Sequence, residues 1–144
     1  MKQIQIINGP NLNLLGKREP EIYGEISFED YFEDLRKKFP GISLHYYQSN
    51  HEGDLIDKLH ETGFIYHGII LNAGALTHYS YALADAIKAV PAPVIEVHIS
   101  DIYAREGFRK VSVTGENCKE IISGKGLPGY ELAVRKILDL NFTP

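Results

Sequence analysis

Glu96 and His98 have the residue types of an acid–base pair. They lie near the end of the apolar run Val94–Ile99. If this run is a β-strand, side chains two residues apart point to the same face of the sheet. The Glu96 carboxylate could then hold one nitrogen of the His98 ring and leave the other nitrogen free for proton transfer.

Tyr23 is a candidate base. A phenol has an ordinary pKa of about 10, so acting as a base at pH 7 would need roughly a 3-unit drop, or about 4 kcal/mol of phenolate stabilisation. A guanidinium in a site closed to water can supply energy of that order. Arg18 lies five residues upstream, so a shared turn could bring it beside Tyr23.

Other polar residues follow apolar runs and would complete a pocket. Asn11 follows the first run, Asn72 and His78 follow the third, and Ser100, Arg105 and Arg109 follow the fourth. Asn8, which ends the first run, is expected to be a structural turn residue. A set so rich in hydrogen-bond donors suits a small, hydroxylated carboxylate as the ligand.

Metal and cofactor motifs do not account for these residues. The six histidines show no HxxxH or HxH spacing, and Cys118 is the single cysteine. The sequence contains no GxSxG and no GxxxxGK[ST] phosphate loop. The stretch Gly124–Gly129 has the spacing of GxGxxG, but it follows the fifth predicted strand, whereas the dinucleotide-binding motif lies in the turn after the first strand. We therefore expect acid–base chemistry by Tyr, His and Arg without a metal or cofactor.

The composition is that of a globular protein of about one domain. The chain has 144 residues, of which 44% are hydrophobic and 24% charged, and a net charge of −4. The charge argues against a nucleic-acid or anionic-membrane surface. A single cysteine excludes an intrachain disulfide and favours a cytoplasmic protein. No signal-peptide pattern and no apolar run of the ~20 residues in a membrane span are present.

Short runs rich in β-branched residues predict five strands. They are Lys2–Ile7, Ile42–Gln48, Phe64–Leu71, Val94–Ile99 and Glu120–Ser123. Apolar residues at helical spacing predict a helix over Phe28–Phe39, with Ser27 as N-cap, and three more helices. The other helical stripes lie around Leu55–Leu59, Ala82–Val90 and Tyr130–Leu138.

This alternation predicts an α/β fold with a flavodoxin-like, doubly wound, five-stranded parallel sheet and helices on both faces. We expect a single domain over residues 1–144. Ligands of such folds bind at the carboxyl ends of the strands. The long segments Asn8–Glu25 and Ser100–Asn117 follow the first and fourth strands, where chemistry or lids are expected.

Five blocks of sequence carry a family resemblance. They are IINGPNLNLLGKREPEIYG (Ile6–Gly24), QSNHEGDLID (Gln48–Asp57), LNAGALTHYSYALADA (Leu71–Ala86), EVHIS (Glu96–Ser100) and GKGLPGYELAV (Gly124–Val134). In this order and at these separations they resemble the type II 3-dehydroquinate dehydratases, from about Ile4 to Ile137. The resemblance implies dehydration of 3-dehydroquinate to 3-dehydroshikimate, the third step of the shikimate pathway, by anti elimination through an enolate. It also implies a flavodoxin-like fold, no cofactor or metal, and a homododecamer of four trimers.

The resemblance assigns roles at matching positions. Tyr23 matches the base, and Arg18 matches the residue that lowers the pKa of that base. Asn11 matches the residue that holds a water near the enolate oxygen. His98 matches the acid that protonates the departing hydroxyl, and Glu96 orients it. A mobile lid over residues 16–25 is implied as well.

The remaining matching positions bind substrate. The backbone N–H groups of Ile99 and Ser100, with the Ser100 hydroxyl, match a clamp for the substrate carboxylate. The resemblance also implies substrate contacts by Asn72 and His78, a contact of Arg109 with a ring hydroxyl, and a contact of Asp85 with the site of a neighbouring subunit.

The chain departs from the family pattern at the rim. Asp101 stands where the family usually has Asn, and Val111 where it tends to have His; residues 113–117 are also atypical. We expect Asp101 to point away from the carboxylate clamp and to cap the turn at Ile102–Arg105.

Two other interpretations use the same fold. A flavodoxin-like nucleotide-binding module would need a phosphate loop after the first strand, which this sequence lacks. A regulatory domain related to phospho-receivers would need clustered acidic residues there, where this chain has Asn8 and Asn11.

Overall fold

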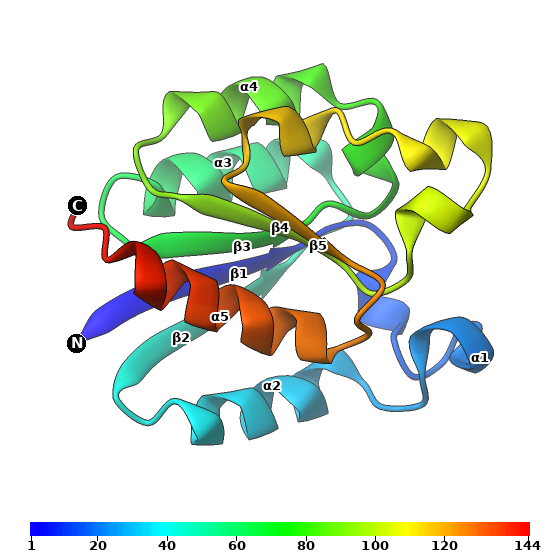
Figure 1. The fold of residues 1–144 in the computed structure, drawn as a ribbon, viewed down its shortest axis with the longest axis horizontal. Helices are drawn as coiled ribbons and strands as arrows, with labels where there is room; N and C mark the ends of the chain where they lie inside the picture. The colour runs from blue at the N-terminus through cyan, green and yellow to red at the C-terminus, as the bar shows by residue number, and fades with distance from the viewer.

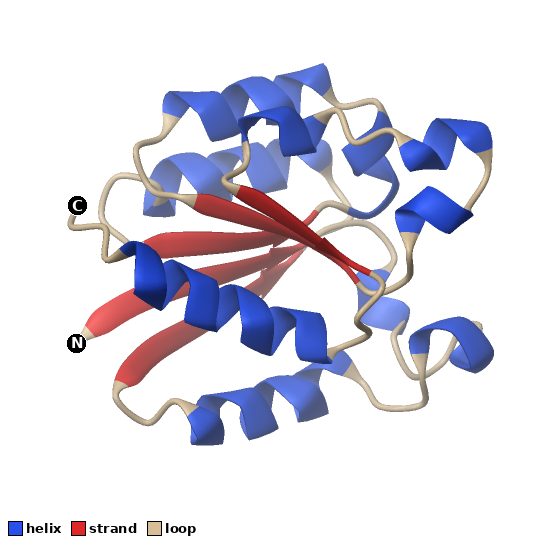
Figure 2. Cartoon of the chain, viewed as in Figure 1, coloured by secondary structure: helices blue, strands red, loops and turns tan.

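A parallel five-stranded sheet forms the centre of the protein (Figures 1 and 2). The computed structural model describes residues 1–144, apart from the side chains of Ile22 and Tyr23. The strand order is β2-β1-β3-β4-β5, and every neighbouring pair is parallel. The strands are β1 (Lys2–Asn8), β2 (Ile42–Gln48), β3 (Gly68–Asn72), β4 (Val94–His98) and β5 (Glu120–Ser123). This order confirms the predicted flavodoxin-like, doubly wound α/β class.

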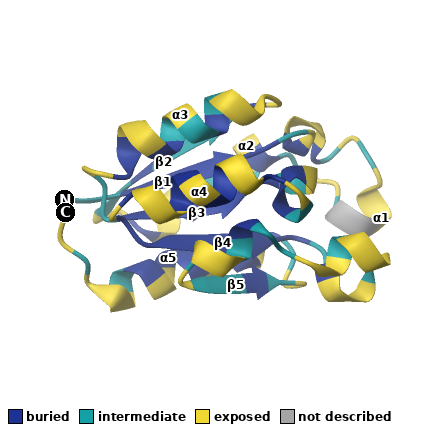
Figure 3. Cartoon of the chain, turned by 90° about the horizontal axis from the view of Figure 1, so that it is seen from above, coloured by how far each residue is buried: buried dark blue, intermediate teal, exposed yellow. Residues whose placement is uncertain are grey.

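Helices cover both faces of the sheet. Helices α2 (Phe28–Lys38) and α5 (Pro128–Leu140) pack on one face, and α3 (Glu52–Thr62) and α4 (Tyr81–Ala89) pack on the other (Figure 1). Each face has its own apolar core, one containing Phe28 and Tyr130 and the other Leu55 and Leu83. The helices turn their buried sides to the sheet and their exposed sides to solvent (Figure 3).

The predicted helix boundaries are close to the observed ones. Ser27 is the N-cap of α2, and its hydroxyl accepts a hydrogen bond from the N–H of Asp30. This cap satisfies one of the free N–H groups in the first turn. The helix ends at Lys38, just before the Pro40-Gly41 pair that predicted its end.

The predicted start of the third strand is wrong. The strand begins at Gly68, not at Phe64. The N–H groups of Ile65 and Tyr66 instead donate to the carbonyl of Thr62 at the end of α3, so the chain continues in turns. Phe64 and Ile65 are 56% and 61% exposed, so their apolar side chains do not belong to the sheet core.

Short 3₁₀ helices gather at the carboxyl ends of the strands. They are η1 (Leu12–Leu14), η2 (Gly74–His78), η3 (Ile102–Ala104) and η4 (Gly107–Lys110). The single turn α1 (Pro20–Tyr23) lies at the same end of the molecule (Figure 1). A separate 3₁₀ helix, η5 (Thr114–Asn117), precedes β5, and its Asn117 side chain donates to the Ala84 carbonyl of α4. In the described part of the chain, every helix is too short or too polar to cross a lipid bilayer.

Candidate active site

A cavity of about 170 Å³ opens at the carboxyl ends of β1, β3 and β4. The predicted site residues that line it are Asn11, Arg18, Asn72, His78, His98, Ile99, Ser100 and Arg109. Arg105, from the long segment after the fourth strand, lines it as well, as its place in the sequence predicts. Among the described residues, no aspartate or glutamate faces this cavity. Arg18, Arg105 and Arg109 all line the cavity, and their positive charges favour an anionic ligand, although Arg18 also pairs with Glu19 over 3.1 Å.

Glu96 and His98 form the contact that their spacing predicts. The Nε2 of His98 lies 2.8 Å from a carboxylate oxygen of Glu96. Both residues are buried, with Glu96 fully enclosed and His98 5% exposed. Since a carboxylate only accepts, Nε2 carries the hydrogen of this contact and Nδ1 remains for another partner.

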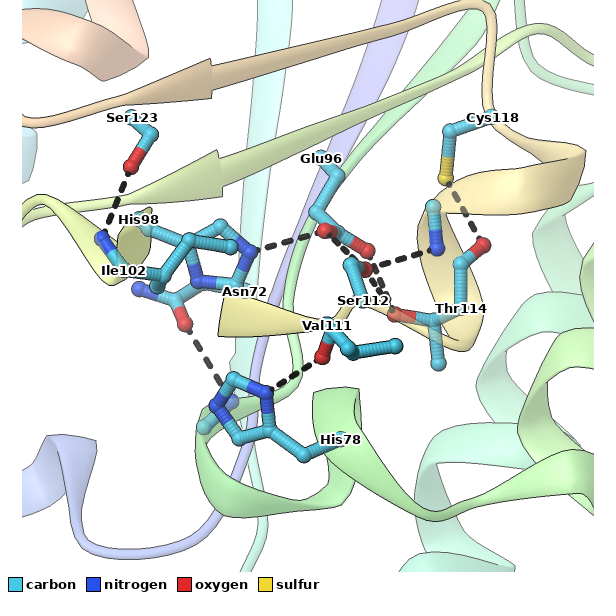
Figure 4. A network of polar contacts seen from close by, with 12 residues as sticks. Asn72, His78, Glu96, His98, Ile102, Val111, Ser112, Thr114, Cys118 and Ser123 are labelled. Atoms are coloured by element: carbon cyan, nitrogen blue, oxygen red, sulfur yellow. Dashed lines mark hydrogen bonds and ion pairs between the residues drawn. The ribbon is translucent and has the colours of Figure 1, made fainter. Parts of the chain in front are cut away.

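The Glu96 carboxylate has two further donors. The Ser112 hydroxyl donates to Oε2 over 2.5 Å, and the Thr114 hydroxyl donates to Oε1 (Figure 4). Burial alone would raise the pKa of Glu96, but the hydrogen bonds from His98, Ser112 and Thr114 outweigh burial and lower the pKa. Glu96 is therefore ionised at neutral pH, although water does not reach it.

Asn72 is fixed by two hydrogen bonds behind the cavity wall. Its Nδ2 donates to the Tyr130 hydroxyl over 3.0 Å, and its Oδ1 accepts from the N–H of Gly74 over 3.2 Å. The Tyr130 hydroxyl donates in turn to Oδ1 of Asn8 over 2.8 Å. Asn8 is completely buried, so its role is structural, as predicted, but it is the last residue of β1 and not a turn residue.

Asn11 lies in the left-handed region, with φ of 70°. Its N–H donates to Oδ1 of Asn50 over 3.0 Å, and the Gln48 side chain donates to the same oxygen over 3.1 Å. Asparagine tolerates this conformation better than most residues. The end of β2 thus holds the turn that brings Asn11 to the cavity.

His78 and Ser100 already have polar partners on the cavity wall. His78 Nδ1 lies 2.7 Å from the Val111 carbonyl oxygen, and this carbonyl can only accept. The ring therefore carries a hydrogen on Nδ1. The Arg105 guanidinium donates to the Ser100 hydroxyl over 3.1 Å, which places a positive charge beside the predicted carboxylate clamp.

The two rim departures leave these contacts in place. The Asp101 side chain accepts from the N–H of Tyr103 and caps η3, as expected, and Asp101 is absent from the cavity wall. The Val111 side chain is 58% exposed, and its contact with His78 is made by the backbone. Replacement of the family's histidine therefore does not remove the His78 contact.

Of the predicted site residues that the structure describes, Glu96 and Asp85 are absent from the cavity wall, and Glu96 lies behind that wall against His98. Asp85 is exposed on α4. The side chain of Tyr23 lies outside the described residues, so the predicted base stays a prediction. Within the described residues, no group of three or more His, Cys, Asp or Glu side chains could hold a metal ion.

Sequence reasoning missed Ser112, Thr114, Tyr130 and Asn50. Each of them forms a hydrogen bond with a predicted site residue that lies 16 or more positions away along the chain. No local sequence pattern identifies such a partner. One general signal was available for Ser112 and Thr114. A glutamate inside an apolar strand needs donors, and hydroxyl residues in the long segment after that strand could supply them.

Comparisons with known proteins agree with this geometry. The family model "Dehydroquinase class II" matches residues 2–138. A 3-dehydroquinate dehydratase of Pelodictyon phaeoclathratiforme is 51% identical over 96% of this chain and 93% of its own. A 3-dehydroquinate dehydratase of Bacillus subtilis is 51% identical over 96% of this chain and 95% of its own. The crystal structure of a type II dehydroquinase from Butyrivibrio crossotus matches with a TM-score of 0.92 and 45% identity, covering 95% of this chain and 97% of that one.

Proposed function

Because this chain belongs to the class II dehydroquinase family, we propose that it is a hydro-lyase that dehydrates 3-dehydroquinate to 3-dehydroshikimate in the shikimate pathway. The contact that carries the proposal is the one between Glu96 and His98 at the cavity. An enclosed imidazole held by an ionised carboxylate suits a general acid for a departing hydroxyl. The arginines of the cavity wall suit a substrate that carries a carboxylate.

The reaction proceeds by anti elimination through an enolate. Tyr23, with its pKa lowered by Arg18, removes the proton from the carbon next to the ketone, and the electron pair of that C–H bond forms the enolate. Asn11 holds a water near the enolate oxygen. The enolate then collapses, the C–O bond breaks, and His98 protonates the departing hydroxyl, so one water leaves. Arg18, Asn11 and His98 line one cavity, which supports their joint action.

The substrate is held by groups at the ends of β3 and β4. The backbone N–H groups of Ile99 and Ser100 clamp the carboxylate. Asn72 and His78 bind the ring substituents, and Arg109 meets a ring hydroxyl. Residues 16–25 close over the opposite face of the ring, which excludes water during the elimination.

The working form is a homo-oligomer, a dodecamer of four trimers, in the cytoplasm. Asp85 completes the site of a neighbouring subunit in this assembly. Its exposed position on α4, away from the cavity of its own chain, supports that role. Sizing of the native protein tests the assembly, and a 16 kDa monomer at working concentration would contradict it.

Product absorbance tests the reaction. The conjugated enone of 3-dehydroshikimate absorbs in the ultraviolet, so adding 3-dehydroquinate to protein treated with a chelator should give a steady rise in absorbance. Borohydride added with substrate should leave activity intact, because no lysine imine forms. No absorbance rise, together with a thermal shift on adding a flavin nucleotide, would instead favour the nucleotide-binding module.

A further inference from the structure

Residues 111–114 contact both histidines of the candidate active site, one directly and one through Glu96 (Figure 4). The Val111 carbonyl accepts from His78 Nδ1 over 2.7 Å. The hydroxyls of Ser112 and Thr114 donate to Glu96, which accepts from His98 Nε2. One short segment therefore reaches both imidazoles, and it includes positions where the chain departs from the family pattern.

The backbone around this segment is anchored. The N–H of Val113 donates to the Thr77 carbonyl over 2.8 Å, which ties the segment to η2. The N–H of Gly115 donates to the Ser112 hydroxyl oxygen over 2.9 Å. Since that oxygen already accepts from Gly115, its own hydrogen is directed to Glu96. Thr114 is completely buried, so water does not compete for its hydroxyl.

We propose that Ser112 and Thr114 are positioning residues for the acid His98, and that they act by holding the Glu96 carboxylate ionised and in one orientation. This inference rests on the proposed function. Each oxygen of Glu96 receives a hydroxyl donor, so the carboxylate cannot rotate without breaking a hydrogen bond. In that orientation Oε2 accepts from Nε2–H of His98. The acid is then the imidazolium form, which gives its Nδ1 proton to the departing hydroxyl and becomes the neutral Nε2–H tautomer.

The charges around Glu96 support this role. The titratable groups that face it are His98 on its own strand and the Cys118 thiol, which follows η5. Burial, and secondarily the negative charge of Glu96, raises the pKa of Cys118, so the thiol is neutral. Its sulfur contacts the Thr114 carbonyl at 3.4 Å rather than Glu96. The hydroxyls of Ser112 and Thr114 are thus the neutral donors that stabilise the buried charge.

Removal of each hydroxyl tests the proposal. Ser112→Ala and Thr114→Val should each lower kcat by about 10-fold, and the double variant by more, because each loses a hydrogen bond to a charged group. KM should stay within about twofold, since neither hydroxyl is expected to touch substrate. The acid limb of the kcat–pH profile should move to higher pH, because Glu96 binds a proton more readily without its donors.

Thr77→Val is the matched control. Thr77 is also completely buried, but its hydroxyl has no hydrogen-bond partner among the described residues. This variant should keep the kcat and pH profile of the wild type, because it removes a buried hydroxyl that holds no carboxylate. If Thr114→Val and Ser112→Ala behave like Thr77→Val, the positioning role is wrong.

A measurement without substrate separates this inference from the proposed function. Nitrogen NMR of the imidazoles in the free protein reports which ring nitrogen of His98 carries the proton. At a pH where the ring is neutral, we expect Nε2–H in the wild type and a mixture of tautomers in the double variant. An inactive wild type with this tautomer change would overturn the proposed function but keep the positioning of His98. An active wild type whose tautomer is unchanged in the double variant would overturn the positioning and keep the function.

Discussion

Asn72 donates a hydrogen bond from its side-chain amide to the hydroxyl of Tyr130, over 3.0 Å and 58 positions along the chain. Tyr130 is completely buried on α5, whereas Asn72 lines the cavity at the end of β3. A helix on one face of the sheet therefore fixes a cavity residue from behind. The remaining hydrogen of the Asn72 amide is the one that can reach a ligand.

Tyr130→Phe should weaken both the fold and substrate binding. The variant leaves Nδ2 of Asn72 and Oδ1 of Asn8 without the Tyr130 hydroxyl inside the protein, which costs about 1–3 kcal/mol of unfolding free energy. Asn72 also loses one of the contacts that orient it, so KM should rise more than kcat falls. Urea unfolding and steady-state kinetics measure the two effects.

Tyr31→Phe is the control for this change. The Tyr31 ring lies 6.2 Å from the Tyr130 ring in the same aromatic cluster, but its hydroxyl does not bond Asn72. We expect wild-type KM for Tyr31→Phe. Equal KM values in the two variants would show that Asn72 is oriented without the Tyr130 hydroxyl.

The sequence predicts the sheet well because strand formation here depends on local pattern. Buried apolar runs with β-branched residues give β1 and β4, whereas the alternation of Ile42, Leu44 and Tyr46 gives β2, which is mostly half-buried. Glycine or proline lies next to each of these strands. The start of β3 is wrong because apolar content alone does not distinguish Phe64 and Ile65 from strand residues. Their place is decided by hydrogen bonds to the end of α3, which is a tertiary effect.

The site is predictable only where its contacts are local or shared with a family. The contact between Glu96 and His98 follows from a two-residue spacing in a strand. The hydroxyls that hold Glu96 come from Ser112 and Thr114, 16 and 18 positions away, across two short 3₁₀ helices whose path no periodicity specifies. Arg105 likewise reaches Ser100 through a turn that composition does not define.

Tyr23→Phe should remove most of the activity while keeping the binding of substrate analogues. Loss of a general base costs about 10²- to 10⁴-fold in kcat, whereas the phenyl ring fills the same space. Rapid-mixing kinetics and calorimetric titration of an analogue measure the two quantities. Tyr103→Phe, which changes a tyrosine that is 54% exposed on η3, is the control and should keep wild-type turnover. Near-normal turnover of Tyr23→Phe would show that another group is the base.

Glu96 should make the fold more sensitive to acid. Its pKa in the folded protein lies below the ordinary value of 4.5, because the hydrogen bonds from His98, Ser112 and Thr114 outweigh the opposite effect of burial. A group with a lowered pKa contributes stability that is full above its unfolded pKa and is lost as the pH falls through its folded pKa. Wild-type unfolding free energy should therefore fall below about pH 4.5 more steeply than that of Glu96→Gln.

Urea unfolding across this pH range measures the difference. Glu33→Gln is the control, since Glu33 is an exposed partner of Arg36 on α2 and such surface pairs contribute little. Its unfolding free energy should follow the wild type at every pH. Parallel curves for wild type and Glu96→Gln would contradict the ionised state assigned to Glu96.

Val111→His, which restores the residue typical of the family, should change activity little. His78 contacts the backbone carbonyl at this position, and the Val111 side chain is largely exposed. Exposed substitutions without specific contacts usually change free energies by less than about 0.5 kcal/mol, so KM and kcat should stay within about twofold. A tenfold change in KM would show that the side chain at this position forms part of the binding site.

Gly9→Ala should distort the cavity, because it changes the packing between the ends of β1 and β3. A Cβ at Gly9 would lie 2.7 Å from the carbonyl oxygen of Ala73 and 2.8 Å from its carbonyl carbon, and these are backbone atoms that cannot turn aside. The N–H of Gly9 also donates to the Asn72 carbonyl over 2.7 Å. If the added methyl pushes residue 9 away from Ala73, this hydrogen bond, which links the ends of β1 and β3, breaks. Overpacking of this kind costs about 1–3 kcal/mol. Because Asn72 moves with this link, kcat/KM should fall together with the unfolding free energy.

Gly53→Ala is the matched substitution with the opposite expected sign. Gly53 lies in the first turn of α3, and a Cβ there would meet nothing within 4 Å. Replacing a helical glycine by alanine usually stabilises by about 0.5–1 kcal/mol, because the unfolded chain loses freedom. Gly53→Ala should therefore have a higher unfolding temperature than the wild type and a wild-type kcat/KM, whereas both quantities should be lower in Gly9→Ala. If Gly9→Ala matches it in both stability and kcat/KM, the tight packing of the β1 and β3 ends does not shape the cavity.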